Sequence, residues 1–178
     1  MIAFVSGGVR SGKSQFAEKT AKMLAKERKG NLYYLATARK SDEEMVERIR
    51  MHQKDRGKTW NTVEEPYDIE KVLKILEQHD VILLDCLTIW LSNVMFDLDY
   101  RITKLEESVI RWITLARKKQ FSLVIVSNEV NEGNPFSDEF VLTYIYSIQK
   151  LHQLIVKEAD VAVVVQAGIP TYWKGGGE

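Results

Sequence analysis

The sequence has little cysteine, no excess of either charge and no long apolar run. Its single cysteine, Cys86, cannot form a disulfide within the chain, so we expect a reducing, cytoplasmic setting and a buried thiol among apolar neighbours. With 25 basic and 25 acidic residues, the chain has no general attraction to nucleic acid or anionic membranes. No apolar run approaches the roughly 20 residues of a membrane span, and the first is too short for a signal peptide. Any bound anion must therefore be held by a local arrangement of residues.

Short apolar runs alternate with stretches of helical spacing or length. The runs lack the period-two alternation of half-exposed strands and lie at residues 2–6, 32–36, 81–85, 123–127 and 161–166. The helical stretches lie at residues 13–28, 41–56, 102–119 and 138–158. This alternation predicts an α/β fold with a mostly parallel sheet flanked by helices.

The length favours a single domain, which we assign to residues 1–173, followed by a flexible tail at residues 174–178. Residues 58–66 show neither helical nor strand periodicity. We expect them to form a loop at the edge of the sheet.

A glycine-rich motif follows the first predicted strand and opens the first predicted helix. It has the P-loop pattern and comprises Gly7, Gly8, Val9, Arg10, Ser11, Gly12, Lys13 and Ser14. Its glycines let backbone N–H groups surround phosphate oxygens, and the helix N-terminus adds partial positive charge. Lys13 is expected to reach the β and γ phosphates, and the Ser14 hydroxyl to ligate Mg²⁺. The motif predicts binding of a nucleoside triphosphate; the alternative is a glycine-rich turn with an exposed lysine.

Polar residues end two further apolar runs. Asp85 follows four apolar residues, and we expect it to be the second Mg²⁺ ligand of the P-loop, on a strand beside the first. Ser127, Asn128 and Glu129 lie where the fourth run ends. For these three residues, a plain strand-ending turn and a catalytic role remain equally open.

One histidine stands between arginines. If residues 41–56 are helical, Arg48, His52 and Arg56 lie on one face, spaced by four residues. Nearby positive charge would keep the imidazole neutral and nucleophilic, and the arginines could clamp phosphates. Spacing alone favours a packing or surface histidine over a nucleophile.

Several further blocks occur in a specific order over residues 1 to about 130. They are YLATA at 34–38, Glu44-Met45 with Arg48-Ile49 and His52, DRG at 55–57, Trp60, VEEP at 63–66, LLDCLTIWLSN at 83–93 and VSNEV at 126–130. Together with the P-loop, they resemble the bifunctional adenosylcobinamide kinase and adenosylcobinamide-phosphate guanylyltransferase family.

The resemblance implies a P-loop NTPase of RecA-like fold, assembled as a homotrimer, with a role in cobalamin biosynthesis or salvage. It implies phosphorylation of the aminopropanol hydroxyl of adenosylcobinamide by ATP or GTP, then transfer of GMP from GTP to that phosphate. The product is adenosylcobinamide-GDP, and the family's covalent GMP-histidine falls on His52. The family's nucleotide contacts fall on Gly7 to Ser14 and on Ala36, Thr37, Ala38, Gln53, Lys54, Asp55, Arg56, Glu64 and Asp85.

The chain departs from the family pattern after Val130. Where members have Gly-x-Gly-Ile-Val-Pro, it reads Asn131-Glu-Gly-Asn-Pro135, and Tyr144-Ile-Tyr146 replaces Arg-Phe-Arg-Asp. Gly168-Ile-Pro170 returns to the pattern, while His79 and His152 match no family role and are interpreted as structural or surface residues. Because the departures leave the P-loop and His52 unchanged, the sequence supports nucleotide binding and guanylyl transfer better than it supports recognition of the corrinoid acceptor. The alternatives are a monofunctional kinase of another small hydroxyl compound and a non-catalytic nucleotide-binding protein.

Overall fold

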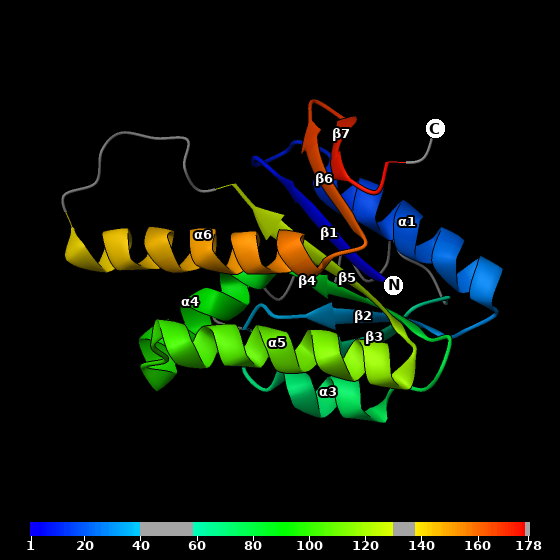
Figure 1. Cartoon of the computed structure of the whole chain (residues 1–178), viewed down its shortest axis with the longest axis horizontal. Helices are drawn as coiled ribbons and strands as arrows, with labels where there is room; N and C mark the ends of the chain where they lie inside the picture. The colour runs from blue at the N-terminus through cyan, green and yellow to red at the C-terminus, as the bar shows by residue number, and fades with distance from the viewer. Residues whose placement is uncertain (40–58, 130–137, 177–178) are drawn as a thin grey trace.

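The computed structural model describes residues 1–39, 59–129 and 138–176, and its centre is a seven-stranded sheet. The strand order is β3-β2-β4-β5-β1-β6-β7, and only the β6–β7 pair is antiparallel (Figure 1). The strands are β1 (Ile2–Gly7), β2 (Leu32–Ala36), β3 (Asn61–Glu64), β4 (Val81–Asp85), β5 (Ser122–Asn128), β6 (Val161–Gln166) and β7 (Ile169–Lys174). The predicted mostly parallel α/β fold is therefore confirmed.

The described helices cover the two faces of the sheet unequally. They are α1 (Lys13–Arg28), α3 (Ile69–Ile75), α4 (Leu87–Leu98), α5 (Ile102–Lys119) and α6 (Glu139–Glu158). The α1 helix packs on one face, and α3 to α6 pack on the other (Figure 1). No described helix is both long enough and apolar enough to span a membrane.

The central strands are buried on both sides, which explains their continuous apolar sequences. Along β1, Phe4 faces the core beneath α3 to α6, and Val5 faces the core beneath α1. The larger core also holds Trp90 of α4 and Trp112 of α5, whose rings meet edge to face at 4.5 Å. Two packed cores thus hold the sheet in place, and the P-loop follows β1 of this sheet.

The expected loop at residues 58–66 is wrong in part, because residues 61–64 form β3. The segment does lie at the edge of the sheet, where it pairs with β2 in parallel register. Three of its four residues are exposed, since among the described strands β3 pairs with β2 alone. An exposed edge strand needs no apolar pattern, so sequence periodicity could not reveal it.

The expected place of Asp85 on a strand beside the first is also wrong. The β4 strand that ends at Asp85 pairs with β2 and β5, and β5 lies between β4 and β1. This arrangement puts the end of β5, at Ser127 to Glu129, next to the P-loop. The strand order therefore gives β5 a more central position than the sequence suggested.

The predicted boundary of the tail falls too early, because Lys174 and Gly175 still pack against the domain. Lys174 is the last residue of β7, and its Nζ donates to the carbonyls of Val156 at 3.3 Å and Lys157 at 2.7 Å. Gly175 lies so close to Asp160 that an added Cβ would come within 2.1 Å of the Asp160 carbonyl oxygen. The chain therefore packs against the domain beyond residue 173.

Candidate nucleotide-binding site

The P-loop connects the end of β1 with the start of α1. Backbone bonds close it: Ser11 N donates to Gly8 O at 3.2 Å, and Phe16 N donates to Gly12 O at 3.0 Å. Gly12, immediately before the helix, has a φ of 91°, which L side chains rarely adopt. The motif thus has the strand-loop-helix context that its sequence predicted, with the N-terminus of α1 at the loop.

Lys13 is the first residue of α1 and is buried. Its Nζ donates to Gly8 O at 3.0 Å, so the ammonium group lies across the loop rather than in solvent. Ser14 follows it and is half-buried, whereas Val9 and Arg10 are exposed. The loop therefore combines a buried cation with an adjacent hydroxyl, and both groups interact favourably with phosphate and its metal ion.

The turn between β6 and β7 packs against the P-loop. Gly168 N donates to Ser11 O at 2.8 Å, and a Cβ on Gly12 would lie 3.3 Å from Gly168 Cα. A Cβ on Gly7 would approach Val165 O to 2.4 Å. The sequence assigned no role to Gly168, since contact between residues so far apart leaves no local signal.

The carboxyl edge of the sheet brings most of the predicted nucleotide contacts together. Parallel register pairs Glu64 with Ala36, and Ala36 with Asp85. On the other side of β5, Gly7 pairs with Asn128. Ala38 follows β2 at the same edge and is half-buried. The remaining predicted residues, His52, Gln53, Lys54, Asp55 and Arg56, lie outside the described residues.

The end of β4 is held by hydrogen bonds from β2 and the residue after it. Tyr34 Oη donates to Asp85 Oδ2 at 2.6 Å, which orients the carboxylate. Thr37 is fully buried; its Oγ1 donates to Cys86 O at 2.8 Å and accepts from Cys86 N at 2.9 Å. Thr37 O also accepts a bond from Asn93 at 2.9 Å. Because its hydroxyl and carbonyl are engaged, Thr37 joins two strand ends and offers little to a ligand.

Cys86 is buried, as predicted. Burial, and then the Asp85 charge, raise the pKa of its thiol, while the Lys13 charge acts in the opposite direction. Its Sγ lies 2.9 Å from Thr88 Oγ1, which also accepts a bond from Asn128 Nδ2 at 3.0 Å. Tyr144 Oη of α6 donates to Thr88 O at 2.8 Å. A neutral, packed thiol thus connects β4, α4 and the end of β5.

Ser127, which is buried, and His152, which is half-buried, form a pair on the α6 side of the sheet. Ser127 Oγ and His152 Nε2 lie 2.7 Å apart, and the imidazole meets the Phe4 ring edge to face at 5.0 Å. Burial lowers the pKa of His152, and the charge of Glu129 only partly opposes this shift. His152 is therefore a neutral structural histidine, whereas His79 is exposed, and both fit the interpretation from sequence.

A metal ion at this edge of the sheet would have few protein ligands. Ser14 supplies a hydroxyl and Asp85 a carboxylate, which are oxygen donors suited to Mg²⁺. Among residues 1–39, 59–129 and 138–176, no group of three or more His, Cys, Asp or Glu side chains is placed to hold a metal. This donor set fits an ion that keeps water and phosphate oxygens as its other ligands.

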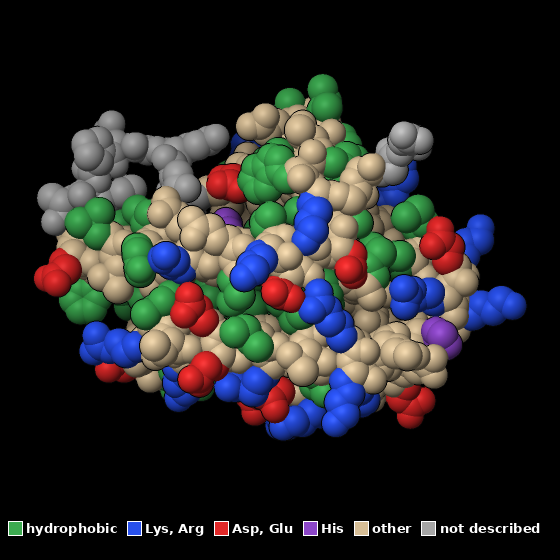
Figure 2. Space-filling view, viewed as in Figure 1, with side chains coloured by type: hydrophobic (Ala, Val, Ile, Leu, Met, Phe, Trp, Pro, Cys, Tyr) green, Lys and Arg blue, Asp and Glu red, His purple; other side chains and the backbone are tan. Residues whose placement is uncertain are grey.

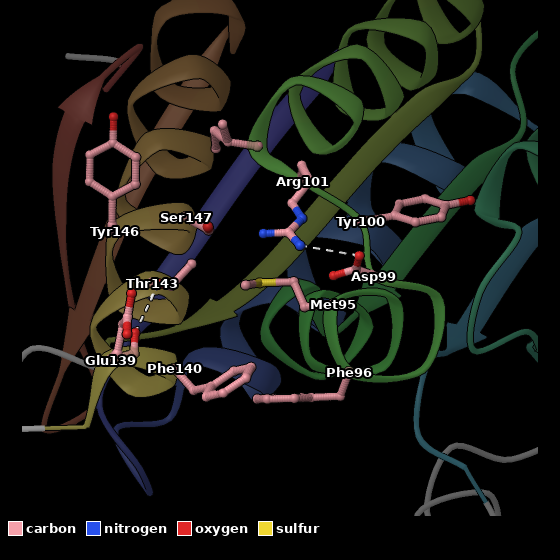
Figure 3. A pocket seen from close by; sticks show the side chains of 11 residues that line it. Met95, Phe96, Asp99, Tyr100, Arg101, Glu139, Phe140, Thr143, Tyr146 and Ser147 are labelled. Carbon is pink, nitrogen blue, oxygen red and sulfur yellow. Dashed lines mark hydrogen bonds and ion pairs between the residues drawn. The ribbon is translucent and has the colours of Figure 1, made fainter.

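A separate cleft of about 520 Å³ lies between the end of α4 and the start of α6 (Figure 3). Its lining is mainly apolar, including Met95, Phe96 and Phe140, and Arg101 pairs with Asp99 at its rim at 3.2 Å. The outer surface nearby carries interspersed acidic and basic side chains (Figure 2). This cleft is chemically unlike the phosphate-binding edge.

Comparisons with known proteins agree with the fold and the motif. The family profile described as "Cobinamide kinase / cobinamide phosphate guanyltransferase" matches residues 3–172. The bifunctional adenosylcobalamin biosynthesis protein CobP of Pseudomonas aeruginosa is 33% identical over 177 residues, covering 98% of each chain. CobU of Salmonella typhimurium is 27% identical, covering 95% of this chain and 97% of that protein.

Solved structures with low sequence identity share the fold. The flagellar accessory protein FlaH of Methanocaldococcus jannaschii has a TM-score of 0.54 at 13% identity, covering 99% of this chain and 80% of that chain. A KaiC-like protein of Pyrococcus horikoshii has a TM-score of 0.52 at 11% identity, and the match covers 92% of this chain and 69% of that chain. The predicted P-loop NTPase fold of RecA-like type is therefore confirmed.

Proposed function

The chain belongs to the cobinamide kinase / cobinamide phosphate guanyltransferase family, and from this premise we propose that it carries out two successive transfers on adenosylcobinamide. The first transfers the γ-phosphoryl group of ATP or GTP to the aminopropanol hydroxyl. The second transfers GMP from GTP to the new phosphate, giving adenosylcobinamide-GDP for cobalamin biosynthesis. The observation that carries the proposal is the P-loop on β1 facing the same sheet edge as Asp85 on β4.

In the kinase step, residues Gly7 to Ser14 bind the triphosphate through backbone N–H groups. Lys13 moves from Gly8 O to the phosphates and stabilises charge that develops in the transition state. Ser14 and Asp85 hold Mg²⁺, which neutralises phosphate charge when bound. Phosphoryl transfer requires mainly positioning and electrostatic stabilisation, and this edge is suited to both.

In the guanylyl step, we assign His52 as the nucleophile. A neutral imidazole attacks the α-phosphorus of GTP, pyrophosphate leaves, and the GMP-histidine then passes GMP to the phosphate of the acceptor. Support comes from the sequence, where Arg48 and Arg56 flank His52 at helical spacing. The proposed nucleotide contacts are completed by Ala36, Ala38, Gln53, Lys54, Asp55, Arg56 and Glu64.

The decisive experiment uses GTP labelled at the α-phosphate. Incubation with Mg²⁺ should leave label on the protein that is released by acid and retained in base, as a phosphoramidate requires. The His52→Ala variant should lose the label. The matched control is His79→Ala, because His79 is exposed and far from the P-loop in the fold.

Each alternative gives a different result in the same assay. An undiminished adduct in His52→Ala would contradict the assigned nucleophile. ATP-dependent phosphorylation with no adduct would indicate a monofunctional kinase of another hydroxyl compound. Nucleotide binding by calorimetry, with neither adduct nor turnover of adenosylcobinamide, would indicate a non-catalytic nucleotide-binding protein.

We further propose that the protein works in the cytoplasm as a homotrimer. The support is the family resemblance, together with a single neutral thiol that suits a reducing compartment. Light scattering should give a mass three times the 20.5 kDa of one chain. A mass of one or two chains would contradict the trimer.

A further inference from the structure

Glu129 follows β5 directly and is fixed beside the P-loop by its backbone. Its N–H donates to Gly7 O at 3.1 Å, which extends the parallel pairing of β5 with β1 by one bond. Because β5 separates β4 from β1, Glu129 lies between the P-loop and the strand that carries Asp85. No residue of the predicted nucleotide contacts occupies this central position.

The carboxylate of Glu129 has acceptor capacity that the described protein does not use. Its Oε1 is buried and has no hydrogen-bond partner among residues 1–39, 59–129 and 138–176. Buried polar atoms nearly always have a partner, and a carboxylate oxygen requires a donor. The unused acceptor therefore indicates a place where a donor arrives with a ligand.

The nearby donors are already engaged elsewhere. Lys13 Nζ donates to Gly8 O, Asn128 Nδ2 donates to Thr88 Oγ1, and His152 Nε2 is bonded to Ser127 Oγ. Alternation along β5 puts Glu129 on the same side as Ser127, and its charge acts on His152. The carboxylate thus lies on the α6 side of the edge, away from the α1 side.

We propose that Glu129 is the general base of the kinase step, an inference that rests on the proposed function. The hydroxyl oxygen of the acceptor bonds to the γ-phosphorus, the bond from that phosphorus to the β,γ-bridging oxygen breaks, and the hydroxyl proton passes to Glu129. The nucleoside diphosphate leaves with the electron pair of the broken bond. Asp85 is less suited to this role, because Tyr34 already donates to its Oδ2.

The two transfers depend on Glu129 differently. An alcohol must lose a proton as it attacks phosphorus, so the kinase step requires a base. A neutral imidazole attacks without losing an oxygen-bound proton, and an ionised phosphate acceptor has no such proton to lose. Loss of Glu129 should therefore affect the kinase step alone.

The test is Glu129→Gln, which keeps the size of the side chain and removes its basicity. We expect kcat of the kinase step to fall by roughly a hundredfold to a thousandfold, with the KM of the nucleotide nearly unchanged. Formation of the GMP-protein adduct should continue at the wild-type rate. The matched control is Glu27→Gln, an exposed residue near the end of α1.

A second variant covers the case in which the amide disturbs the fold. Glu129→Ala should be equally slow, and added formate should restore part of its kinase rate by supplying a carboxylate. Absence of formate rescue in a folded Glu129→Ala protein would contradict the proton transfer.

The remaining outcomes distinguish this inference from the proposed function. A kinase rate within about threefold of wild type in Glu129→Gln would overturn the inference and leave the two transfers in place, because a lost general base costs at least a hundredfold. Equal loss of both activities would assign Glu129 to nucleotide binding instead. Failure of the wild-type protein to phosphorylate adenosylcobinamide would contradict the proposed function itself.

Discussion

The ends of β4 and β5 are neighbours at one edge of the sheet, yet they hold their carboxylates differently. Asp85 is oriented by the Tyr34 hydroxyl, and the residue that follows it is fixed by Thr37. Glu129 is fixed by its backbone, while its Oε1 has no partner in the described part of the chain. An oriented carboxylate suits a cation that stays in one place, whereas an unpartnered one suits a proton that arrives and leaves.

Replacing Asp85 should produce the largest effect, and it tests whether the roles of Asp85 and Glu129 differ. Asp85→Asn removes the charge proposed to hold Mg²⁺, which both transfers use, so both rates should fall by about a thousandfold. The measurement is each half-reaction assayed separately at several Mg²⁺ concentrations. Loss of the kinase step alone would show that Asp85 and Glu129 share one role, which would remove the distinction.

Replacing Tyr34 should have a smaller effect, and it tests whether the Tyr34 hydroxyl is what orients Asp85 for the metal ion. Tyr34→Phe removes the donor to Asp85 Oδ2, so the Mg²⁺ concentration for half-maximal activity should rise by about tenfold. Saturating Mg²⁺ should restore the rate. Tyr33→Phe is the matched control, since Tyr33 packs against the opposite core. An unchanged Mg²⁺ requirement would mean that Asp85 needs no orientation by Tyr34.

On the β5 side, Ser127→Ala should act on stability rather than on the metal. The change leaves the Nε2 of the half-buried His152 without its partner, and the free energy of unfolding should fall by about 1–2 kcal/mol. Urea denaturation followed by circular dichroism gives this value. A concurrent rise in the Mg²⁺ requirement would show that the two strand ends are coupled.

The smallest expected effect concerns pH. Because the pKa of His152 is lowered from 6.5 by burial, the unfolded chain binds more protons than the folded one below that pH. The stability contributed by the neutral ring is present above pH 6.5 and is lost as pH falls toward the folded-state pKa. Urea denaturation from pH 8 to pH 5 should show a flatter dependence in His152→Gln than in wild type. His79→Gln should keep the wild-type slope.

Much of the fold could be predicted from the sequence, because burial leaves a local pattern. The ranges of β2, β4 and β6 and of α1 and α5 agree with prediction to the residue, since apolar runs and helical spacing mark them. The exposed edge strands β3 and β7 carry no such pattern. The α4 helix starts directly after Cys86, which makes no side-chain cap, so no capping signal marks its start.

The candidate site could likewise be predicted only in part from the sequence. The P-loop was predictable because its function depends on adjacent residues, whose order is visible in the sequence. The bonds from Tyr34 to Asp85 and between Ser127 and His152 join residues far apart in the chain. The position of β5 between β4 and β1 is likewise a property of the whole sheet, and it determines where Glu129 lies.

The contact between Gly168 and Ser11 has a consequence for the order of events during synthesis. The P-loop leaves the ribosome well before the turn between β6 and β7 that supports it, because the two are far apart in the chain. A nascent chain that lacks residue 168 has all the phosphate-binding residues and lacks the bond from Gly168 N to Ser11 O. Tight nucleotide binding should therefore begin only when translation has passed this turn, and not when the P-loop itself has been made.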